Sequence, residues 1–389
     1  MEKYIFKRVL HPVGQGAFFT EQFYDSNENI IFNVVYDCGE MRTKRHLEKE
    51  IDNTLNVTGK PEVVDVMFIS HLDEDHINGI DYLVKLGCLT KRSLVILPLH
   101  YPLVLKLILQ QLGNNGLGKF GGGTAAILSS LFNSEAKILG IDDNEEQLKI
   151  DSLRIDEGLL NVNNYSQIKS MQPLVYKDLW YYLPFNTILD DERYQKFLNA
   201  LAAAKIDRNL LADFDYVQKH LDTLIDIYRS LPQGIGKVTA INVNSLNVLS
   251  YCTQREGLSF MWLNYLVNGC RWCYPWNYHL ACDNRCSCLY TGDCVMDAHF
   301  NKCLDALVKY INAKIGMLQI PHHGRQSCYD KATACRSEII TGFTNFNSTH
   351  KKNRFVKQIV HDFSVTGRML FQITEHFHSR MEMYVEVIL

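Results

Sequence analysis

The chain opens with short apolar runs separated by polar turns, followed by segments of helical period. The first three runs predict strands joined by a glycine turn and by the polar residues 25–29. Later runs rich in β-branched residues predict buried strands, and apolar residues three or four apart predict helices between them. In the first 112 residues we expect strands at 4–9, 17–23, 30–36, 63–69 and 93–97, and helices at 44–55, 77–86 and 101–112.

The remainder of the chain continues this mixture with one helical interruption. Short strands are predicted at 136–139, 147–155 and 174–182, and we expect them in a second sheet. Residues 191–231 are charged, Ala-rich and helical in period, which predicts two antiparallel helices inserted into the fold. Beyond them we expect a helix at 298–311 and strands at 237–251, 288–291, 316–320, 368–374 and 383–388.

A dense group of titratable side chains follows the apolar run 63–69. His71, Asp73, Asp75 and His76 are expected in a strand-to-helix turn, at the carboxyl end of a strand, where α/β folds place ligands. Side chains of these types so close together would repel and desolvate one another unless a cation held them. A solvated acidic turn is the alternative, which the preceding apolar strand disfavours. The cluster therefore predicts a metal site.

With Gly79 behind it, this cluster resembles the second motif of the metallo-β-lactamase superfamily, in the form where Asp replaces the middle His. That form is similar to the soluble domain of DNA-uptake proteins of the ComEC type. Other segments resemble the family's remaining motifs in the same order: residues 12–16 (PVGQG), 34–39 (VVYDCG), 244–246 (NSL), 290–293 (YTGD) and 320–324 (IPHHG). The resemblance implies an α+β fold, a four-layer αββα sandwich, with residues 1–389 as a single domain.

The resemblance also implies a pair of divalent metal ions, zinc or manganese. The metal ligands it implies are His71, Asp73, Asp75, His76, Asp293 and His322, with Asp293 between the two ions and His323 as the alternative to His322. Catalysis would rest on His71, Asp75 and Asp293, with a water activated by the two ions. Manganese becomes credible beside zinc because Asp73 replaces an imidazole with a harder ligand. Asp37 is expected to orient a ligand from behind.

Substrate contacts are expected from polar residues around this cluster: Asn244, Ser245, His323, His350 and Lys351. For the Asn-Ser pair, a turn or an edge strand is an equal alternative. Lys351 begins a basic cluster, 351–357, that could bind phosphate or could form a solvated helix start. Residues 342–347 lie where the family has a glycine-rich turn. The middle histidine of the wider superfamily has no counterpart, and His100, His220 and His279 are the available substitutes.

A Cys-rich and aromatic insertion, 265–288, offers a further metal site. Four of its thiols, Cys270, Cys273, Cys282 and Cys286, have a spacing that could close a structural zinc site. Free thiols that pack as small hydrophobic groups are the alternative. The chain has 12 cysteines and no evident secretory signal, which together favour a reducing cytoplasm.

Composition restricts the function that these motifs suggest. A net charge of -3 gives no general attraction to nucleic acid, so a polyanionic substrate needs a local basic lining. The most apolar window, 94–112, is broken by prolines and charged residues, so no membrane span is expected. We expect a metal-dependent phosphodiesterase that acts on DNA. The alternatives are a hydrolase of a small cyclic or modified nucleotide or other small ester, or an effector subunit that requires a protein partner at 191–231.

Overall fold

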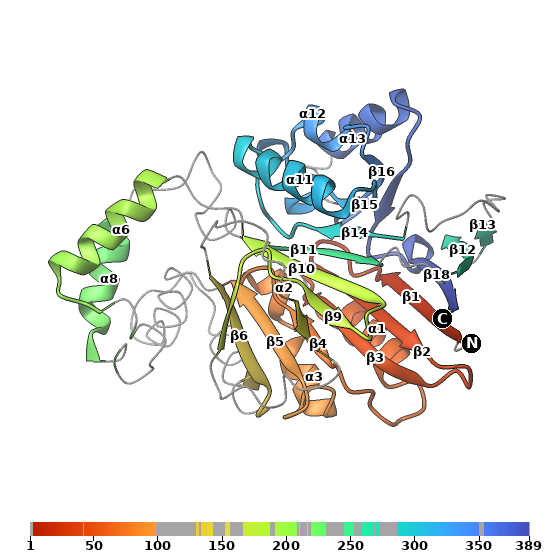
Figure 1. The fold of residues 1–389 in the computed structure, drawn as a ribbon, viewed down its shortest axis with the longest axis horizontal. Coiled ribbons are helices and arrows are strands. Elements are labelled where there is room, and N and C mark those ends of the chain that lie inside the picture. The colour runs from red at the N-terminus through yellow and green to blue at the C-terminus, as the bar shows by residue number, and fades with distance from the viewer. Residues whose placement is uncertain are drawn as a thin grey trace.

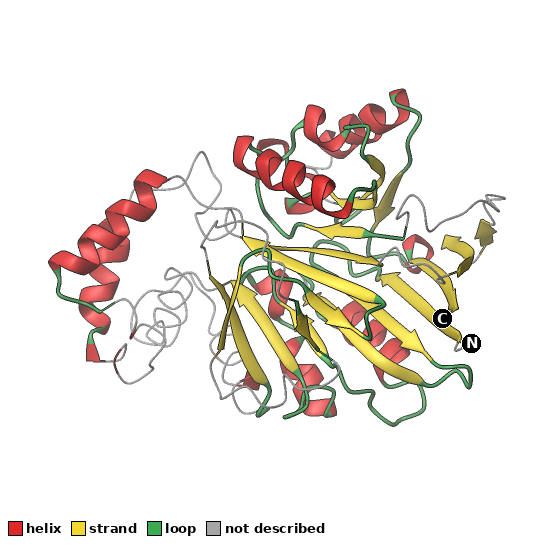
Figure 2. Ribbon diagram, in the orientation of Figure 1, coloured by secondary structure: helices red, strands yellow, loops and turns green. Residues whose placement is uncertain are grey.

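The structure is a computed structural model of the 389-residue chain. It describes residues 3–41, 43–98, 130–131, 134–142, 152–155, 166–186, 191–207, 210, 216, 219–230, 245–252, 259–267, 270–272, 286–349 and 354–388. Within these ranges two β-sheets pack face to face and helices cover their outer faces (Figures 1 and 2).

The first sheet contains ten strands among the described residues. Its order is β13 (Cys270–Trp272), β12 (Ser259–Val267), β18 (Met381–Ile388), β1 (Lys3–Leu10), β2 (Phe18–Tyr24), β3 (Ile30–Cys38), β4 (Val66–Phe68), β5 (Leu94–Pro98), β6 (Lys137–Asp142) and β8 (Ser166–Lys169). The strands from β12 to β3 pair antiparallel, whereas those from β3 to β8 pair parallel. The parallel half therefore directs its carboxyl ends to one edge of the sheet.

The second sheet contains eight strands in the described part of the chain. Its order is β17 (Leu370–Ile373), β16 (Ile339–Asn345), β15 (Ile315–Gln319), β14 (Cys288–Tyr290), β11 (Leu246–Cys252), β10 (Trp180–Asn186), β9 (Leu174–Tyr176) and β7 (Leu153–Arg154). Strands β14 to β17 pair parallel. The loops that follow β14, β15 and β16 consequently lie at a common edge, as do those after β3 and β4.

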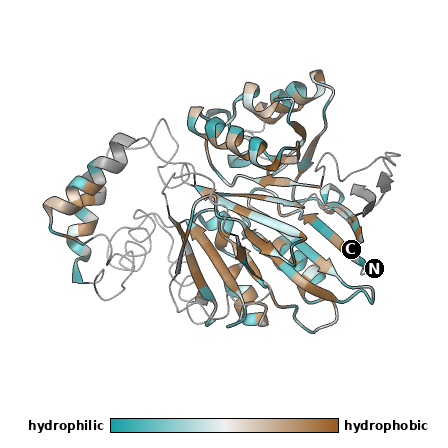
Figure 3. Cartoon of the chain, viewed as in Figure 1, coloured by the Kyte–Doolittle hydropathy of each residue, from teal (hydrophilic) through white to brown (hydrophobic). Residues whose placement is uncertain are grey.

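Three apolar clusters separate the four layers. The central cluster lies between the sheets and contains large aromatic side chains from both, including Phe19, Trp180 and Tyr290. A second cluster packs the first sheet against helices α1 (Arg45–Leu55), α2 (Glu74–Ile77) and α3 (Ile80–Leu86). A third packs the second sheet against α11 (Ala298–Ile311), α12 (Lys331–Ala334) and α13 (Arg354–Val365). The predicted αββα sandwich is confirmed, and Figure 3 shows its apolar strands in brown.

The metal-motif segment is more helical than predicted. The expected helix 77–86 is two short helices, and the first begins at Glu74, so Asp75 and His76 lie on α2 instead of in a turn. Asp73, in an extended conformation, precedes this helix, and its carbonyl accepts from His76 N at 2.9 Å. The periodicity did not indicate this turn of helix because polar residues occupy it.

Two strand predictions in the middle of the chain were wrong. Residues 174–182 form a hairpin of β9 and β10, because Lys177 and Asp178 both adopt positive φ, 47° and 52°, in a tight turn that Leu179 N closes by donating to Tyr176 O at 2.9 Å. Strand β6, expected in the second sheet, pairs parallel with β5 in the first. Its Leu139 faces the central core and its Ile138 faces the helix layer, as is typical of an internal parallel strand.

The remaining expected segments are partly outside the described residues. Of 191–231, the structure describes α6 (Asp191–Ala203) and α8 (Leu221–Ser230), which contact each other. The expected helix 101–112 and most of 147–155 and 237–251 lie outside. Strands β12 and β13 extend the edge of the first sheet beside β18 and include part of the Cys-rich insertion. No helix among the described residues is long and apolar enough to cross a membrane.

Candidate metal centre

The candidate site lies where the loops after β4, β14 and β15 meet between the two sheets. Two backbone contacts hold these loops in place: Leu246 N, at the start of β11, donates to Ser70 O at 2.8 Å, and His322 N donates to Gly292 O at 3.0 Å. Gly292 adopts φ +52° and leaves no room for a side chain, since a Cβ would lie 2.6 Å from Ser70 Cβ. This close approach brings Asp293 to the histidines of the first sheet.

Two groups of donor atoms converge at this edge. His71, His76 and Asp293 form one, and Asp75, His76 and His323 form the other; within each, the potential ligand atoms all lie within 4.8 Å of one another. Asp293 Oδ2 lies 3.6 Å from His71 Nε2 and 3.5 Å from His322 Nε2. Asp73 lies at the margin, with Oδ2 3.7 Å from His71 Nε2. All six predicted metal ligands are therefore near this centre.

The donor set fits a divalent metal ion. Nε2 of His71 and of His76 is buried and has no hydrogen-bond partner among the described residues. A buried polar atom without a partner is costly, so a cation that binds these two atoms would be stabilising. Imidazole nitrogens mixed with carboxylate oxygens suit zinc or manganese.

Charge at the site is set by competition between burial and neighbours. Burial, with the positive field of His76, lowers the pKa of His71 to about 4. Burial also disfavours a charged His76, but Asp293 and Asp37 outweigh it and hold the His76 pKa well above its ordinary value. Burial favours a neutral Asp293, yet the imidazoles around it, His322 first, keep its pKa well below the usual range. The carboxylates thus stay ionised and available to a cation.

Asp37, at the end of β3, supports the site from behind. Its Oδ2 lies 2.7 Å from His76 Nδ1 and accepts from Ser70 Oγ at 2.6 Å, while Oδ1 accepts from Ser70 N at 2.6 Å. Asp37 therefore fixes both the His76 ring and the loop that carries His71. The sequence suggested that Asp37 orients a ligand, and these contacts are compatible with that hypothesis.

Glycines allow the segment 12–16 to pack against Asp75. A Cβ on Gly16 would lie 2.9 Å from Asp75 O, and one on Gly39 would lie 2.3 Å from the same atom. Ala17 N donates to Asp75 O at 3.2 Å. The motif residues around Gly16 therefore hold the backbone of a candidate ligand, and they contribute no side chain to the site.

The predicted substrate contacts have different outcomes. Ser245 is fully buried, and its hydroxyl accepts from Asp293 N at 2.9 Å, so it supports the Asp293 loop. His323 lies in the site, with Nε2 3.2 Å from Asp75 Oδ2. Asn244, His350 and Lys351 lie outside the described residues. Gly342–Asn345 belongs to strand β16, so the expected glycine-rich turn is not formed there.

The structure describes one of the three histidines considered as substitutes and only part of the possible structural zinc site. His220 packs against Tyr216 in the helical insertion, and His100 and His279 are outside the described residues. Cys286 is buried beside Cys252, with the two sulfurs 3.3 Å apart. Cys273 and Cys282 are not described, nor is the side chain of Cys270.

Several supporting residues were not identified from the sequence. Asn345, at the end of β16, is buried and its Nδ2 lies 3.1 Å from His323 Nδ1. Gln319 Oε1 accepts from Thr291 N and Gly292 N, which holds the loop that carries Asp293. Arg325 Nη1 lies 3.1 Å from His322 Nε2. A signal existed for Gln319, a polar residue near the carboxyl end of the predicted strand 316–320. Asn345 lies in the segment 342–347, where a glycine-rich turn was expected instead of strand β16.

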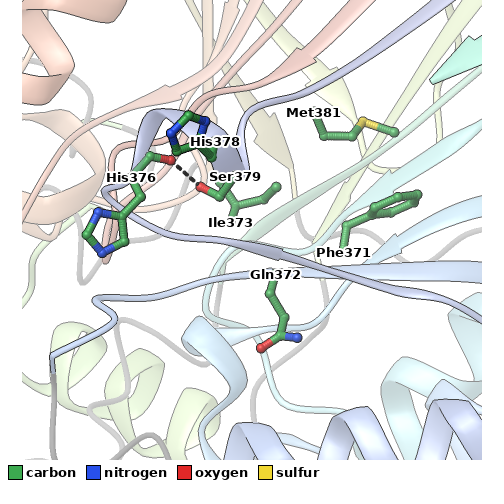
Figure 4. Close-up of a pocket in the computed structure, with 7 residues that line it drawn as sticks. All are labelled: Phe371, Gln372, Ile373, His376, His378, Ser379 and Met381. Carbon is green, nitrogen blue, oxygen red and sulfur yellow. Dashed lines mark hydrogen bonds between the residues drawn. The ribbon is translucent and has the colours of Figure 1, made fainter. Parts of the chain in front are cut away.

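A cavity of about 280 Å³ lies beyond the end of β17 and does not include any candidate metal ligand. Its lining comes from β17, β18 and the short turn after β17: Phe371, Gln372, Ile373, His376, His378, Ser379 and Met381 (Figure 4). Ser348 joins this turn to the loop after β16 through Glu375 and lies 3.0 Å from His376 Nε2.

Comparison with known proteins adds little to this geometry. No family model matches the sequence, and no curated protein matches it. A solved structure, the metallo-β-lactamase-fold protein YhfI from Bacillus subtilis, is 11% identical and aligns over 97% of this chain and 99% of that chain, with a TM-score of 0.39.

Proposed function

We propose that this chain is a metal-dependent hydrolase, specifically a phosphodiesterase that cleaves DNA. One observation carries the proposal: buried imidazole nitrogens of His71 and His76 converge with the Asp293 carboxylate where strands of both sheets end. Residues with no role but structure would not leave such atoms without hydrogen bonds in a packed interior.

In this proposal His71, Asp73 and His322 would hold one zinc or manganese ion, Asp75 and His76 would hold a second, and Asp293 would be a ligand between them. Ions held there would lower the pKa of a water and offset negative charge on the reacting phosphoryl group. The chain's own residues fix the geometry: Asp37 orients His76, and Ser245 holds the Asp293 loop. Mixed imidazole and carboxylate ligands support either metal.

The negative charges at the centre indicate that metal must bind before the substrate does. The ionised carboxylates of Asp75 and Asp293 would repel a phosphodiester anion at this depth. The guanidinium of Arg325, next to His322, supplies one positive charge at the site. Cations bound among the carboxylates would remove the repulsion, so we expect no phosphodiester cleavage by protein freed of metal.

We choose DNA as the substrate because the metal motif, in which Asp73 takes the place of a histidine, resembles that of DNA-uptake proteins.

A test is cleavage of labelled single-stranded and double-stranded DNA by protein loaded with manganese or zinc, beside the Asp75→Asn and Asp293→Ala variants. Asp305→Asn is the matched control, because Asp305 is an exposed carboxylate paired with Arg336. Metal content should be measured in every variant by mass spectrometry.

The outcomes separate the alternatives. Cleavage that Asp75→Asn and Asp293→Ala abolish, and Asp305→Asn leaves intact, supports the nuclease. Metal-loaded protein that leaves DNA intact but cleaves a cyclic dinucleotide indicates a small-nucleotide hydrolase. Metal-loaded, folded protein that is inactive on both contradicts the stand-alone phosphodiesterase and directs attention to a protein partner at 191–231.

A further inference from the structure

Four histidine rings meet at the candidate metal centre, and their hydrogen-bond partners divide them into two kinds. A neutral imidazole carries hydrogen on one nitrogen and a lone pair on the other. The group that faces one ring nitrogen therefore determines what the other can offer. A ring can bind metal through Nε2 only when its hydrogen is on Nδ1.

His71 and His76 have the arrangement of metal ligands. His76 Nδ1 lies 2.7 Å from Asp37 Oδ2, which can only accept a hydrogen bond when ionised. His71 Nδ1 lies 2.9 Å from Ser70 Oγ. Because that hydroxyl donates its hydrogen to Asp37 at 2.6 Å, its oxygen accepts from the ring. Both rings carry hydrogen on Nδ1, so Nε2 of each faces the site and can bind a metal ion, which on His76 takes the place of a proton.

His322 has the same arrangement from different partners. Its Nε2 lies 3.1 Å from Arg325 Nη1, which can only donate. Its Nδ1 lies 3.4 Å from Cys328 Sγ, which can accept from the ring. The lone pair is therefore on Nε2, the atom that lies 3.5 Å from Asp293 Oδ2. A metal ion bound to His322 would take the place of the hydrogen that Arg325 donates to this lone pair.

His323 has the opposite arrangement. Its Nδ1 lies 3.1 Å from Nδ2 of Asn345, and an amide nitrogen can only donate. The orientation of this amide is fixed, because Nδ2 also donates to the carbonyl oxygen of Gly16. Turning the amide over would place two oxygen acceptors against each other in the buried interior. His323 Nδ1 accordingly accepts, and the hydrogen is on Nε2.

The backbone turns the two adjacent histidines toward these different partners. His322 and His323 have φ of 52° and 53°, and Gly324 has φ of 75°. Consecutive left-handed residues are uncommon, and they occur mostly where a site requires them. As a result, the planes of the two rings make an angle of 84°. Nε2 of His323 is then buried, 3.2 Å from Asp75 Oδ2 and 3.8 Å from Asp293 Oδ1, and it makes no well-directed hydrogen bond to either carboxylate.

We propose that His323 is not a metal ligand but a neutral hydrogen-bond donor, whose Nε2–H binds an oxygen of the reacting phosphoryl group. This role rests on the proposed phosphodiesterase function. A donor fixed in place before the reaction stabilises negative charge that grows on that oxygen, and it does so without transferring its hydrogen. Asn345 is the positioning residue that keeps the hydrogen on Nε2.

The test compares His323→Gln and His323→Ala with His76→Gln. Gln retains an N–H near the Nε2 position but is a poor metal ligand, so His323→Gln and His323→Ala should both keep the wild-type zinc content. His76→Gln should lose zinc. With labelled single-stranded DNA, His323→Ala should lower kcat by about 100-fold, the usual effect of removing one such donor. His323→Gln should recover much of that loss, and His361→Gln, on the exposed face of α13, is the control.

A spectroscopic measurement tests the assignment without any activity. In zinc-loaded protein labelled with ¹⁵N-histidine, long-range proton–nitrogen correlation spectra report which ring nitrogen carries hydrogen, and the His323→Gln variant identifies the signal of His323. Hydrogen on Nε2 supports the proposal. Hydrogen on Nδ1, or loss of one equivalent of zinc in His323→Gln, would overturn it. If DNA is not cleaved, the spectra and zinc content still decide the role of Nε2, so the two failures are distinguishable.

Discussion

At the scale of single residues, the candidate centre depends on side chains that hold other side chains. Asp37 adopts φ of 54°, a left-handed conformation that costs on the order of 1–2 kcal/mol in a residue with a side chain. Its hydrogen bonds with Ser70 and its contact with His76 offset that cost. The strain is therefore located where a ligand must be oriented.

The first prediction concerns Asp37→Asn. The amide cannot reproduce the charge beside His76 Nδ1, so the ring loses its preferred orientation and its Nε2 becomes a weaker ligand. We expect metal affinity to fall by about 10- to 100-fold, the usual effect of losing such a partner. Competition with a chelator measures it, and Asp81→Asn, on the surface of α3, is the control. Unchanged affinity in folded Asp37→Asn would contradict the role.

The second prediction concerns Asp65, at the opposite end of β4 from the metal centre. Burial raises the pKa of Asp65 to about 6, while its carboxylate oxygen accepts from Asn33 N at 2.8 Å. The folded state therefore binds the proton more tightly than the unfolded state, in which the pKa is about 3.9. The resulting contribution to stability is complete below pH 4 and disappears as pH rises through 6.

Asp65→Asn imitates the protonated acid and retains an acceptor for Asn33. At pH 7.5 we expect it to raise the free energy of unfolding by about 2–3 kcal/mol, since each pKa unit is worth about 1.4 kcal/mol. At pH 4 the variant and the wild type should be equally stable. Urea unfolding at the two pH values measures both. A stability difference that does not change with pH would show that the Asp65 carboxyl does not titrate between them.

At the scale of elements, the site depends on how closely segments approach. Gly39, just after β3, faces the backbone of Asp75 on α2, and no Cβ fits between them. Asn78 links the same segments, since its side chain accepts from Glu40 N and donates to Glu40 O. Glu40 in turn accepts from His46 N and Leu47 N and so caps α1. The candidate ligand Asp75, the end of β3 and the start of α1 are therefore held together by close packing and hydrogen bonds.

The third prediction is that Gly39→Ala displaces Asp75. The added methyl would lie 2.3 Å from the carbonyl carbon of Asp75, so the backbone must move. We expect a loss of stability of about 1–3 kcal/mol, typical of overpacking, together with reduced metal content. Gly59→Ala is the control: nothing lies near its Cβ, but its φ of 74° carries strain of about 1–2 kcal/mol. Gly59→Ala should lose stability and keep its metal, whereas a Gly39→Ala protein with full metal content would contradict the prediction.

At the scale of the whole molecule, a buried ion pair joins the two sheets. Arg8 on β1 donates to Glu21 on β2 at 2.7 Å, and the same guanidinium reaches the carbonyl of Cys286 and the hydroxyl of Ser250 in the other layer. Tyr290 and Ser250 donate to Glu21. Burial opposes the charge of Arg8, but Glu21 keeps its pKa well above the ordinary value.

The fourth prediction is that Arg8→Met destabilises the protein by about 3–5 kcal/mol, because Glu21 would remain buried without its cation. Arg8→Met combined with Glu21→Gln should be less destabilised than the sum of the single variants, since neither charge is then left alone. Urea unfolding measures all three. Lys3→Met, which breaks an exposed pair with Glu386, should change stability by no more than about 1 kcal/mol. Strict additivity of Arg8→Met and Glu21→Gln would mean that the two side chains do not stabilise each other.

The sequence by itself determined most elements and the identity of the clustered ligands. Helix 298–311 is found with the predicted bounds, and His71, His76 and Asp293 follow predicted strands, because periodicity and strand ends are encoded by neighbouring residues. The tertiary structure decided the rest. The sheet that includes β6, the burial of Ser245 and the contact of Asn345 with His323 depend on residues distant in the chain. Local patterns do not specify such contacts, since they arise only when two sheets pack together and each buried polar atom must find a partner.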